Sequence, residues 1–472
     1  MIALTHCKDK TLYVLGLARS GRAVVAAALA GGARVLAWDD GAEARDRVAA
    51  EFPQAAITAP DDADWTGVAL LVPAPGVPLT HPEPHPAVRA ARTANVPVAG
   101  DVELFAREFP MARIVGITGT NGKSTTTALL GHILADAGQD TVVAGNIGRP
   151  ILELDPPTAD RVHVIELSSY QLDLCERLRP QVAILLNITP DHLDRHGDMA
   201  GYVRAKHRLF RNMGPGTTAV IGIDDRYGRD LVDMLSHPDG PKVVPFAIGR
   251  PRPGAVYALN DQLFADGIVI MGLTDLPALP GEHNQQNIAA ACGAAMALGV
   301  SARFLARGVR SFPGLPHRIE RVGIQDGIRF YNDSKATNAE AAARALSAFR
   351  NIYWIAGGKP KEGDLSALYP LLDRVRHTYL IGMAEARFAV ELSGRTDCVP
   401  SGTLQRAIEQ AWADARAERA ADAADSDSDA DIEDSIILLS PACASFDQFT
   451  SFEARGDAFR TIVQQMLQGG DG

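Results

Sequence analysis

A glycine-rich turn followed by Lys123 and Ser124 is the segment of this sequence best suited to chemistry. It reads Thr-Gly-Thr-Asn-Gly-Lys-Ser-Thr over residues 118–125 and follows an apolar, strand-like run. In such a turn, backbone N–H groups and the start of the next helix bind phosphate. The lysine reaches the β- and γ-phosphates, and the serine hydroxyl can ligate Mg²⁺. We therefore predict that the turn binds ATP or a close relative, with a helix over residues 125–137.

The spacing within this turn departs from the common phosphate-binding pattern. Five residues, not four, separate Gly116 from Gly122, and residue 117 is isoleucine. A glycine-rich turn that binds no nucleotide is the alternative interpretation. The Lys-Ser-Thr sequence at a strand–helix junction favours nucleotide binding.

Polar residues also follow the next predicted strands. Glu166 ends an apolar run at residues 162–165, where an acid can hold a Mg²⁺ ion that bridges nucleotide phosphates; a helix cap is the alternative. His192 belongs to a polar cluster at residues 187–196. Because ligands of α/β sheets bind at the carboxyl ends of strands, His192 is a candidate metal ligand. Lys206 follows on a predicted helix and, taken alone, is an ordinary solvated lysine.

Lysine is rare in this chain, which makes its positions informative. Only eight of the 46 basic residues are lysine, and four of them stand in motif-like stretches: Lys123, Lys206, Lys335 and Lys361. Where arginine supplies the ordinary surface charge, a lysine is better suited to act as a compact point charge or as a deprotonatable amine. Chance retention is the alternative for any one of them.

Two amide side chains, Asn284 and Asn287, stand three residues apart at the start of an Ala-rich helix predicted over residues 288–298. They share a helical face and could hydrogen-bond a nucleotide base, with an ordinary helix start as the alternative. Closely spaced polar groups also follow a strand or a linker at residues 314–318, 332–338 and 440–449.

The N-terminal residues 11–40 predict a strand, a turn, a helix and a second strand that ends at Asp39. This is a Rossmann-like half, in which Asp39 stands where a ribose-binding acid would be. The glycines of the turn do not have GxGxxG spacing, so the pattern is weak evidence for NAD. A second rigid turn surrounds Gly76 at residues 73–78. Either could be a simple tight turn, but together they favour a pocket for a nucleotide-like group.

Strands and helices alternate from about residue 100 onward, and the alternation resumes after a linker at residues 313–316. This pattern predicts βαβ units and mostly parallel sheets. The predicted fold class is α/β with three domains: a Rossmann-like domain over residues 1–102, a central P-loop ATPase-like domain over 103–314 and a C-terminal Rossmann-like domain over 315–472. An Ala/Asp/Ser-rich acidic run at residues 414–434 is expected to be an insertion that is solvated or disordered.

Composition limits the class of protein. The chain has 472 residues, enough for two or three domains, with 46% hydrophobic and 22% charged residues, as in soluble globular proteins. A net charge of −11 argues against a general surface for nucleic acid or anionic membranes. Without a signal-like N-terminus or an apolar run of about 18 residues, we expect a cytoplasmic protein that does not insert into membranes. The five scattered cysteines are expected to be reduced thiols.

Taken in order, these segments resemble the Mur ligases over nearly the whole chain. The shared motifs are Glu-His-Asn at residues 282–284, Leu-Pro-His-Arg at 315–318 and Asn-Asp-Ser-Lys-Ala-Thr-Asn at 332–338. The stretch at residues 440–449 and the short first domain resemble the member that adds D-glutamate. The phosphate turn is also similar to that of folylpolyglutamate synthases.

The resemblance implies ATP-dependent ligation of D-glutamate to UDP-N-acetylmuramoyl-L-alanine in cytoplasmic peptidoglycan precursor synthesis. The reaction would pass through an acyl phosphate and give ADP and phosphate, with ATP and two Mg²⁺ ions as cofactors and a carbamylated Lys206. We also expect a monomer. Among the alternatives, a folylpolyglutamate synthase lacks the separate N-terminal domain, and an NAD(P)-dependent oxidoreductase leaves Lys123 and Lys206 unexplained. A P-loop switch or motor ATPase would need no acceptor amino acid, and another Mur ligase would take a different one.

The resemblance assigns roles to individual residues. ATP would contact Gly119, Thr120, Asn121, Gly122, Lys123, Ser124, Thr125, Asn284, Asn287, Arg318, Asp333 and Lys335. The catalytic residues would be Lys123, Glu166, His192 and Lys206, and the metal ligands Ser124, Glu166, His192 and Lys206. The UDP-substrate would be held by Ser20, Asp39, Gly76 and Asn146. D-Glutamate would be held by His317, Thr337, Lys361, Ser445 and Phe446. The chain departs from the family at Lys359, where an acid is common, and at Asp40-Gly41, which lacks the polar pair of some members.

Overall fold

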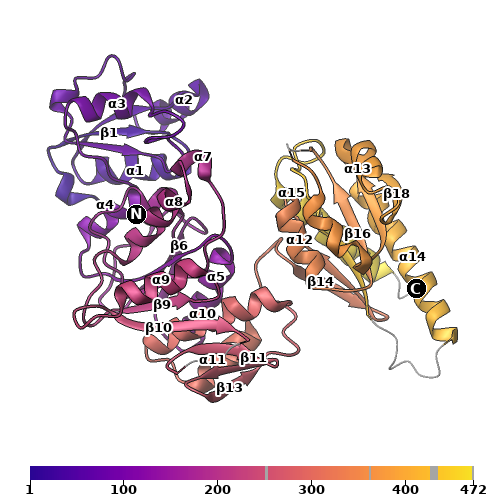
Figure 1. Ribbon diagram of the computed structural model, residues 1–472. Coiled ribbons are helices and arrows are strands. Elements are labelled where there is room, and N and C mark those ends of the chain that lie inside the picture. Colours follow the sequence, from indigo (N-terminus) through magenta and orange to yellow (C-terminus); the bar gives the residue numbers. More distant parts are fainter. Residues whose placement is uncertain (250–252, 361–362, 426–433, 470–472) are drawn as a thin grey trace. The chain divides into compact units, whose positions relative to one another are not determined.

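Three β-sheets with helices packed against them make up the protein (Figure 1). The computed structural model describes residues 1–249, 253–360, 363–425 and 434–469. The chain divides into two compact units, Met1–Thr274 with Gln285–Phe312, and Asp275–Asn284 with Pro313–Gly472. The predicted α/β fold class is confirmed. No helix within the described ranges is both long and apolar enough to cross a membrane.

The first sheet has four parallel strands in the order β3-β2-β1-β4. Its strands are β1 (Thr11–Leu15), β2 (Arg34–Trp38), β3 (Ala56–Ile57) and β4 (Leu70–Pro73), and its helices are α1 (Arg19–Ala30), α2 (Ala42–Glu51), α3 (Pro86–Thr93) and α4 (Asp101–Glu108). Side chains alternate along β1: Leu12 and Val14 share a core with α1, whereas Tyr13 and Leu15 share one with α3. The strand–turn–helix–strand pattern predicted for residues 11–40 is confirmed.

The second sheet has nine strands in the order β13-β12-β11-β10-β9-β8-β5-β7-β6. Its strands are β5 (Arg113–Thr118), β6 (Thr141–Gly145), β7 (Val162–Glu166), β8 (Val182–Leu185), β9 (Thr218–Gly222), β10 (Lys242–Ile248), β11 (Val256–Leu259), β12 (Gln262–Ala265) and β13 (Ile268–Gly272). The helices of this segment are α5 (Lys123–Asp136), α6 (Ser169–Leu172), α7 (Leu193–His196), α8 (Met199–His207), α9 (Arg226–Leu235), α10 (Glu282–Ala297) and α11 (Ala302–Ser311). The strands from β6 to β11 pair in parallel, as predicted. The antiparallel strands β12 and β13 were not predicted.

Strand β5, which leads into the phosphate turn, lies between β7 and β8. Glu166 at the end of β7 and Asn187 just after β8 therefore flank the turn. This arrangement is the one in which parallel α/β sheets bind ligands beyond the carboxyl ends of their strands.

The first two sheets share one continuous cluster of buried apolar side chains. Val25 on α1 and Phe105 on α4 belong to it together with Leu152 of the central segment, and Ile2 N donates to Leu152 O (3.0 Å). The predicted boundary near residue 102 therefore separates two sheets within a single compact unit.

The third sheet, in the second unit, has the strand order β14-β15-β19-β16-β17-β18. Its strands are β14 (Glu320–Gln325), β15 (Ile328–Asn332), β16 (Ile352–Gly357), β17 (Val375–Ile381), β18 (Asp397–Gly402) and β19 (Ser435–Leu439), and its helices are α12 (Ala339–Ser347), α13 (Glu385–Glu391), α14 (Leu404–Asp425) and α15 (Phe452–Gly469). All neighbours are parallel except β14 with β15. One face of the sheet packs on α12 and α13 and the other on α14 and α15 (Figure 1).

The acidic run at residues 414–434 begins as part of α14, so the expectation that it is solvated or disordered is wrong for this first part. Asp414 accepts a hydrogen bond from the hydroxyl of Tyr379 (2.7 Å), and the neighbouring Ala415 is buried. Residues 426–433 lie outside the described ranges. The beginning of the run therefore packs against the sheet through its acidic side chains.

We expect residues 420–431 to be replaceable by a short Gly/Ser linker with the melting temperature and catalytic activity near those of the unchanged protein. This segment is rich in acidic and small residues, whereas Glu418, just before it, accepts from the hydroxyl of Tyr353 (2.9 Å) and lies 2.5 Å from His377 Nε2. Glu418→Gln should lower the melting temperature, because it removes a charged acceptor. Thermal unfolding of both variants is the measurement, and a large fall for the linker variant would contradict the expectation.

Candidate active site

The phosphate turn has the backbone geometry of an anion-binding loop. Gly122 caps α5 at φ 83°, and a Cβ atom there would lie 2.1 Å from Asn287 Oδ1, so only glycine fits. Lys123 Nζ donates to the carbonyl oxygens of Gly119 (3.0 Å) and Thr120 (2.8 Å). The predicted helix is confirmed, with its start two residues earlier than expected, at Lys123. The N-terminus of α5 thus follows the glycine turn directly, and a helix N-terminus favours the binding of an anion such as phosphate.

The other residues predicted to contact nucleotide in this turn are held by the neighbouring strand end. Thr120 N donates to Asn187 O (2.8 Å), and Asn121 N donates to Asn187 Oδ1 (2.9 Å). Ser124 and Thr125 are buried on the first turn of α5. The segment after β8 thus holds the phosphate turn in place through hydrogen bonds to Asn187.

Glu166 is a buried carboxylate with one oxygen left without a partner. Its Oε1 accepts from Asn146 Nδ2 (2.9 Å), whereas Oε2 is buried and has no hydrogen-bond partner among the described residues. An unpaired buried carboxylate oxygen is unfavourable unless a cation binds it. The position therefore fits a hard divalent cation such as Mg²⁺, which prefers oxygen ligands.

Lys206 is also buried, beside the phosphate turn. Its side chain is 1% exposed, and Nζ donates to Gly119 O (2.8 Å), the oxygen that Lys123 also contacts. The ammonium lies 4.5 Å from the centre of the Tyr202 ring. Burial, together with the positive charge of Lys123, lowers the pKa of Lys206 well below its usual range. The interpretation of Lys206 as a solvated surface lysine is therefore wrong.

His192 stands at the start of α7 in the left-handed backbone region, at φ 53°. Its Nδ1 lies 3.1 Å from the hydroxyl of Tyr170 and its Nε2 lies 3.4 Å from Asp191 Oδ2, and the side chain is 46% exposed. The imidazole is therefore held in one orientation and accessible. Helix α7 begins directly after His192 and α8 contains Lys206; Figure 1 shows these two helices close together, and they are in direct contact.

The residues predicted to hold the UDP-substrate lie in two places within the first unit. Asp39 binds the first turn of its own sheet: Oδ2 accepts from Leu17 N (2.6 Å) and Oδ1 from Gly41 N (2.8 Å). Ser20 lines a very small cavity together with Pro73 and Ala74, and Gly76 is exposed on the loop that follows them. Asn146 is instead beside Glu166, so it lies at the carboxyl ends of the central strands.

A buried arginine connects the N-terminal loop to the segment that carries His192. Arg195 NH2 donates to Val77 O (3.2 Å), next to Gly76, and its guanidinium lies 5.4 Å from the ring centre of Tyr170. The loop around Gly76 and the candidate metal ligand His192 are therefore held by one short chain of contacts.

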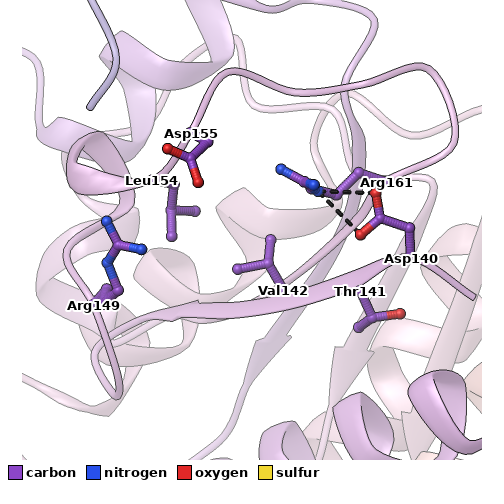
Figure 2. A pocket seen from close by; sticks show the side chains of 7 residues that line it. All are labelled: Asp140, Thr141, Val142, Arg149, Leu154, Asp155 and Arg161. Atoms are coloured by element: carbon purple, nitrogen blue, oxygen red, sulfur yellow. Dashed lines mark hydrogen bonds and ion pairs between the residues drawn. The ribbon is translucent and has the colours of Figure 1, made fainter.

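A cavity of about 220 Å³ beside β6 contains none of the predicted site residues (Figure 2). Its lining residues are Asp140, Thr141, Val142, Arg149, Leu154, Asp155 and Arg161. Arg161 Nε pairs with Asp140 Oδ2 at 3.0 Å, so its charge is already compensated. We assign no function to this cavity.

In the second unit, the predicted residues gather around the ends of β15 and β19. Asp333 is buried: Oδ1 accepts from Ile319 N (3.2 Å) and Oδ2 from the hydroxyl of Ser440 (2.8 Å). Burial raises the pKa of Asp333 to about 7. Arg318 Nε is buried without a partner in the described part of the chain, so this guanidinium can still donate to a ligand.

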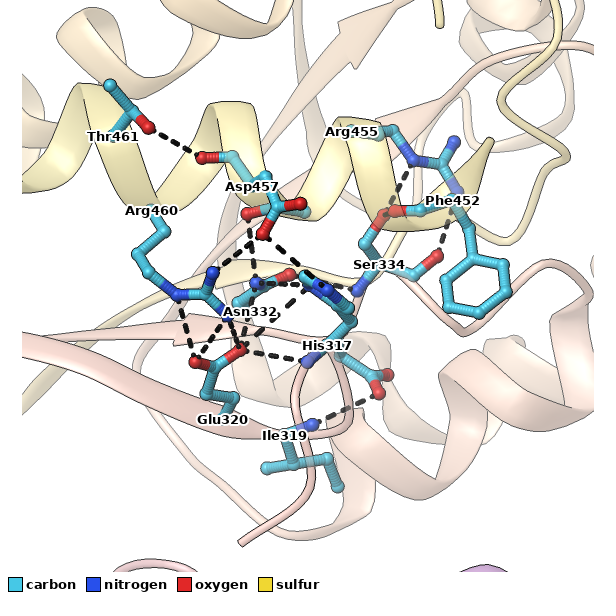
Figure 3. A network of polar contacts seen from close by, with 12 residues as sticks. His317, Ile319, Glu320, Asn332, Ser334, Phe452, Arg455, Asp457, Arg460 and Thr461 are labelled. Atoms are coloured by element: carbon cyan, nitrogen blue, oxygen red, sulfur yellow. Dashed lines mark hydrogen bonds and ion pairs between the residues drawn. The ribbon is translucent and has the colours of Figure 1, made fainter. Parts of the chain in front are cut away.

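His317 belongs to a polar network that joins its loop to α15 (Figure 3). His317 N donates to Glu320 Oε2 (2.8 Å), and Asn332 Nδ2 lies 3.1 Å from His317 Nδ1. Arg460 Nε donates to Glu320 Oε1 (3.1 Å). Lys335 N donates to His317 O (3.0 Å), so the His317 and Lys335 segments are in direct contact.

Of the residues predicted to hold D-glutamate, Ser445 is buried and Thr337 half-buried, whereas Phe446 is 68% exposed. Lys361 lies outside the described residues. Phe452, which the sequence analysis did not single out, packs edge-on against His317 with ring centres 6.2 Å apart and lies 5.5 Å from Lys335 Nζ. Its sequence signal was only an aromatic residue at the start of the last helix.

The two amides on α10 have different neighbours. Asn287 Oδ1 accepts from the hydroxyl of Thr126 (3.2 Å) and belongs to the first unit. Asn284 Nδ2 donates to Pro280 O (2.7 Å) and belongs to the second unit. Asn287 therefore directly supports the phosphate turn.

Comparisons with known proteins identify relatives over the whole chain. The Mur ligase middle domain matches residues 117–295, and the Mur ligase glutamate ligase domain matches residues 317–471. A relative from Caulobacter vibrioides (strain NA1000 / CB15N), named UDP-N-acetylmuramoylalanine--D-glutamate ligase, is 47% identical over 480 residues, which cover 100% of this chain and 99% of the relative. The relative of the same name from Phenylobacterium zucineum (strain HLK1) is 46% identical over 99% of both chains.

This chain belongs to the Mur ligase family. Solved structures of other Mur ligases have the same fold. UDP-N-acetylmuramate-alanine ligase from Thermotoga maritima aligns with a TM-score of 0.55 at 17% identity over 97% of this chain and 99% of that chain. MurF from Acinetobacter baumannii aligns with a TM-score of 0.54 at 18% identity over 98% and 93%. The first Mur ligase domain match contains the phosphate turn, Glu166, His192 and Lys206, and the second contains His317, Asp333 and Ser445.

Proposed function

We propose that this Mur ligase joins D-glutamate to UDP-N-acetylmuramoyl-L-alanine in peptidoglycan precursor synthesis, with conversion of ATP to ADP and phosphate. The full-length similarity to ligases of that name supports the substrates. The observation that carries the chemistry is the convergence of Lys123 and Lys206 on Gly119 O, together with the unpaired carboxylate oxygen of Glu166 at the end of the adjacent strand β7. The protein would act as a cytoplasmic monomer.

Mg²⁺ would be held by side chains on four different elements, namely Ser124, Glu166, His192 and Lys206. Bound Mg²⁺ would neutralise charge on the transferring phosphoryl group. Lys206 needs a chemical change to serve as a ligand, because an ammonium has only donors. Its lowered pKa favours the neutral amine, which can add to CO₂ with loss of a proton and give an anionic carbamate. We propose two ions and a carbamylated Lys206.

The chain's own groups would bind and orient the phosphates. The N–H groups of the turn and Lys123 would hold the β- and γ-phosphates while the L-alanyl carboxylate attacks the γ-phosphorus in line. ADP leaves and an acyl phosphate results. The amine of D-glutamate then attacks the acyl carbon, and phosphate leaves as the amide forms. The remaining ATP contacts would come from Gly119, Thr120, Asn121, Gly122, Thr125, Asn284, Asn287, Arg318, Asp333 and Lys335.

The two substrates would use loops at the strand ends of the first and third sheets, with Asn146 added from the second sheet. The UDP-substrate would contact Ser20, Asp39, Gly76 and Asn146. D-Glutamate would contact His317, Thr337, Lys361, Ser445 and Phe446. The exposure of Phe446 leaves its ring free for a ligand, and the contacts of Phe452 with His317 and Lys335 add it to this group of candidates.

Phosphate release is the direct test of this proposal. The purified protein is given ATP, Mg²⁺ and UDP-N-acetylmuramoyl-L-alanine, and then D-glutamate, L-glutamate, L-lysine or no amino acid. We expect phosphate release only when D-glutamate is the amino acid added. Release with L-lysine would indicate another Mur ligase, and equal release without an amino acid would indicate an ATPase of a different kind.

We expect Ser445→Ala to raise the KM for D-glutamate roughly tenfold or more while the KM for ATP stays near the wild-type value. A hydrogen bond to a charged group is worth about 1.5–3 kcal/mol, and about 1.4 kcal/mol corresponds to tenfold. Ser445 is buried after β19, next to the loop of Lys359. Steady-state kinetics of Ser445→Ala beside the exposed Ser366→Ala is the measurement. Equal KM values for D-glutamate in the two variants would remove Ser445 from the site.

A further inference from the structure

Arg455, in the first turn of α15, is a buried cation whose hydrogen-bond acceptors are a hydroxyl and carbonyl oxygens (Figure 3). Its side chain is 1% exposed. Nε donates to the Ser334 hydroxyl (2.9 Å), and NH2 donates to the carbonyl oxygens of Ser334 (2.9 Å) and Cys443 (3.1 Å). NH1 donates to Ala444 O (3.4 Å). No ion pair joins Arg455 to a carboxylate in the described ranges.

The acceptors of Arg455 belong to two loops that carry candidate ligand-binding residues. Ser334 directly precedes Lys335, and Ala444 directly precedes Ser445. Both loops follow neighbouring parallel strands, β15 and β19, so their relative position decides how these side chains face a ligand. Arg455 hydrogen-bonds to both loops, which the contact between the Ser440 hydroxyl and Asp333 Oδ2 also joins.

A third loop depends on the same contacts. Lys359 N donates to Ala444 O (2.8 Å) and Ala444 N donates to Lys359 O (3.1 Å). Gly358 stands at φ 132°, and a Cβ atom there would lie 2.4 Å from Ala444 O and 3.1 Å from Arg455 NH1. Glycine is therefore needed for this loop to approach the guanidinium. The loops of Ser334, Ala444 and Gly358 therefore all lie against the guanidinium of Arg455.

The buried charge has a second consequence, which is electrostatic. Burial lowers the pKa of Arg455 to about 10, so the guanidinium remains charged at neutral pH. Asp447 and Asp333 compensate this charge through space, but neither forms an ion pair with Arg455 in the described ranges, and the remaining field attracts an anion nearby. Its donation to Ala444 O also polarises the peptide group whose N–H belongs to Ser445, and polarisation along a chain of hydrogen bonds strengthens that donor.

We propose that Arg455 is a positioning residue for the acceptor amino acid, which holds the Ser334 and Cys443–Ala444 loops in place and favours an acceptor with an anionic side chain. It does not touch the substrate, because the carbonyl groups and α15 enclose it. This inference rests on the proposed function and deepens it, since it explains how an overall anionic protein selects a dicarboxylic amino acid.

The test compares Arg455→Met and Arg455→Lys with Arg374→Met. Arg374 is a matched control, because NH1 donates to two carbonyl oxygens in the same unit, Ser347 O and Phe349 O, both at 3.2 Å. The readouts are the KM for D-glutamate, the KM for ATP, the melting temperature, and the inhibition constant of D-glutamine, a neutral competitor. D-Glutamate-dependent phosphate release by the wild type is measured first, and its absence would overturn the proposed function itself.

We expect Arg455→Met to raise the KM for D-glutamate at least about tenfold and Arg455→Lys to raise it less. The inhibition constant of D-glutamine should change much less, because the variant removes the attraction for an anionic side chain and leaves the loops folded. If the wild type is active, the proposal is overturned when Arg455→Met and Arg374→Met have the same KM for D-glutamate. It is also overturned when Arg455→Met weakens the binding of D-glutamate and of D-glutamine by the same factor. If Arg455→Met does not fold, Arg455→Lys decides, and an unchanged KM at an unchanged melting temperature overturns the proposal.

Discussion

Lys206→Ala should lose almost all ligase activity and regain part of it when acetate is added. If Lys206 is a carbamate at the metal, alanine leaves the site without a carboxylate-like ligand. Lost metal assistance amounts to several kcal/mol of transition-state stabilisation, which corresponds to a fall in kcat of about 10³-fold. Acetate supplies a carboxylate of similar size to the vacated position. The measurement is kcat with increasing acetate at constant ionic strength.

The control for this experiment is Lys242→Ala, an exposed lysine at the start of β10. It should have wild-type kcat and no response to acetate. Full activity in Lys206→Ala would end the carbamate proposal. A deep loss of kcat that acetate does not restore would indicate that the buried amine has a structural role, through its hydrogen bond to Gly119 O.

Glu166→Gln should shift the Mg²⁺ dependence of the reaction to much higher concentration without lowering the melting temperature of the ligand-free protein. The unpaired Oε2 of Glu166 is the feature that distinguishes it from a structural acid. An amide can still accept from Asn146 Nδ2 through its oxygen, and the uncompensated buried charge is removed. The loss of a carboxylate ligand should lower kcat/KM at limiting Mg²⁺ by about 10²-fold or more.

Glu103→Gln is the matched control, because Glu103 is a fully buried acid in the same unit whose oxygens are all engaged. It accepts from Glu176 N and Arg177 N (both 2.8 Å) and from Arg107 Nε (2.8 Å). Its variant should melt at a lower temperature with an unchanged Mg²⁺ dependence. Binding of Mn²⁺, measured by its electron paramagnetic resonance signal, gives a readout apart from activity. Equal Mn²⁺ affinity of wild type and Glu166→Gln would contradict the assignment.

The local elements could be predicted from the sequence, because their causes are local. The apolar run at residues 114–117, the glycines and the Lys-Ser pair predict a strand, a phosphate turn and a helix, and β5, the positive φ of Gly122 and α5 confirm them. The alternation of strands and helices predicts parallel sheets, because parallel strands need crossover connections. The hairpin of β12 and β13 escaped prediction, because its short strands interrupt that alternation at the sheet edge.

The acidic run shows where composition misleads. Its acidic and small residues favour a solvated segment, yet Asp414 and Glu418 are one helical turn apart and face the hydroxyl groups of Tyr379 and Tyr353. Those tyrosines lie on β17 and β16, at least 35 residues away in sequence. The residues within the run do not reveal that tyrosine hydroxyls on distant strands need hydrogen-bond acceptors.

The sequence by itself determined the elements, the ATP-type turn and the candidate residues at the strand ends. Only the tertiary structure decided that Lys206 is buried against Gly119 O, that Glu166 keeps an unpaired oxygen and that the buried Arg455 hydrogen-bonds to two loops. Each of these properties is a balance between desolvation and partners that come from 87 residues away, in the case of Lys206, or from another strand. Spacing along the chain can place a charged side chain at a strand end, but burial and unmet hydrogen bonds exist only once the sheets have packed.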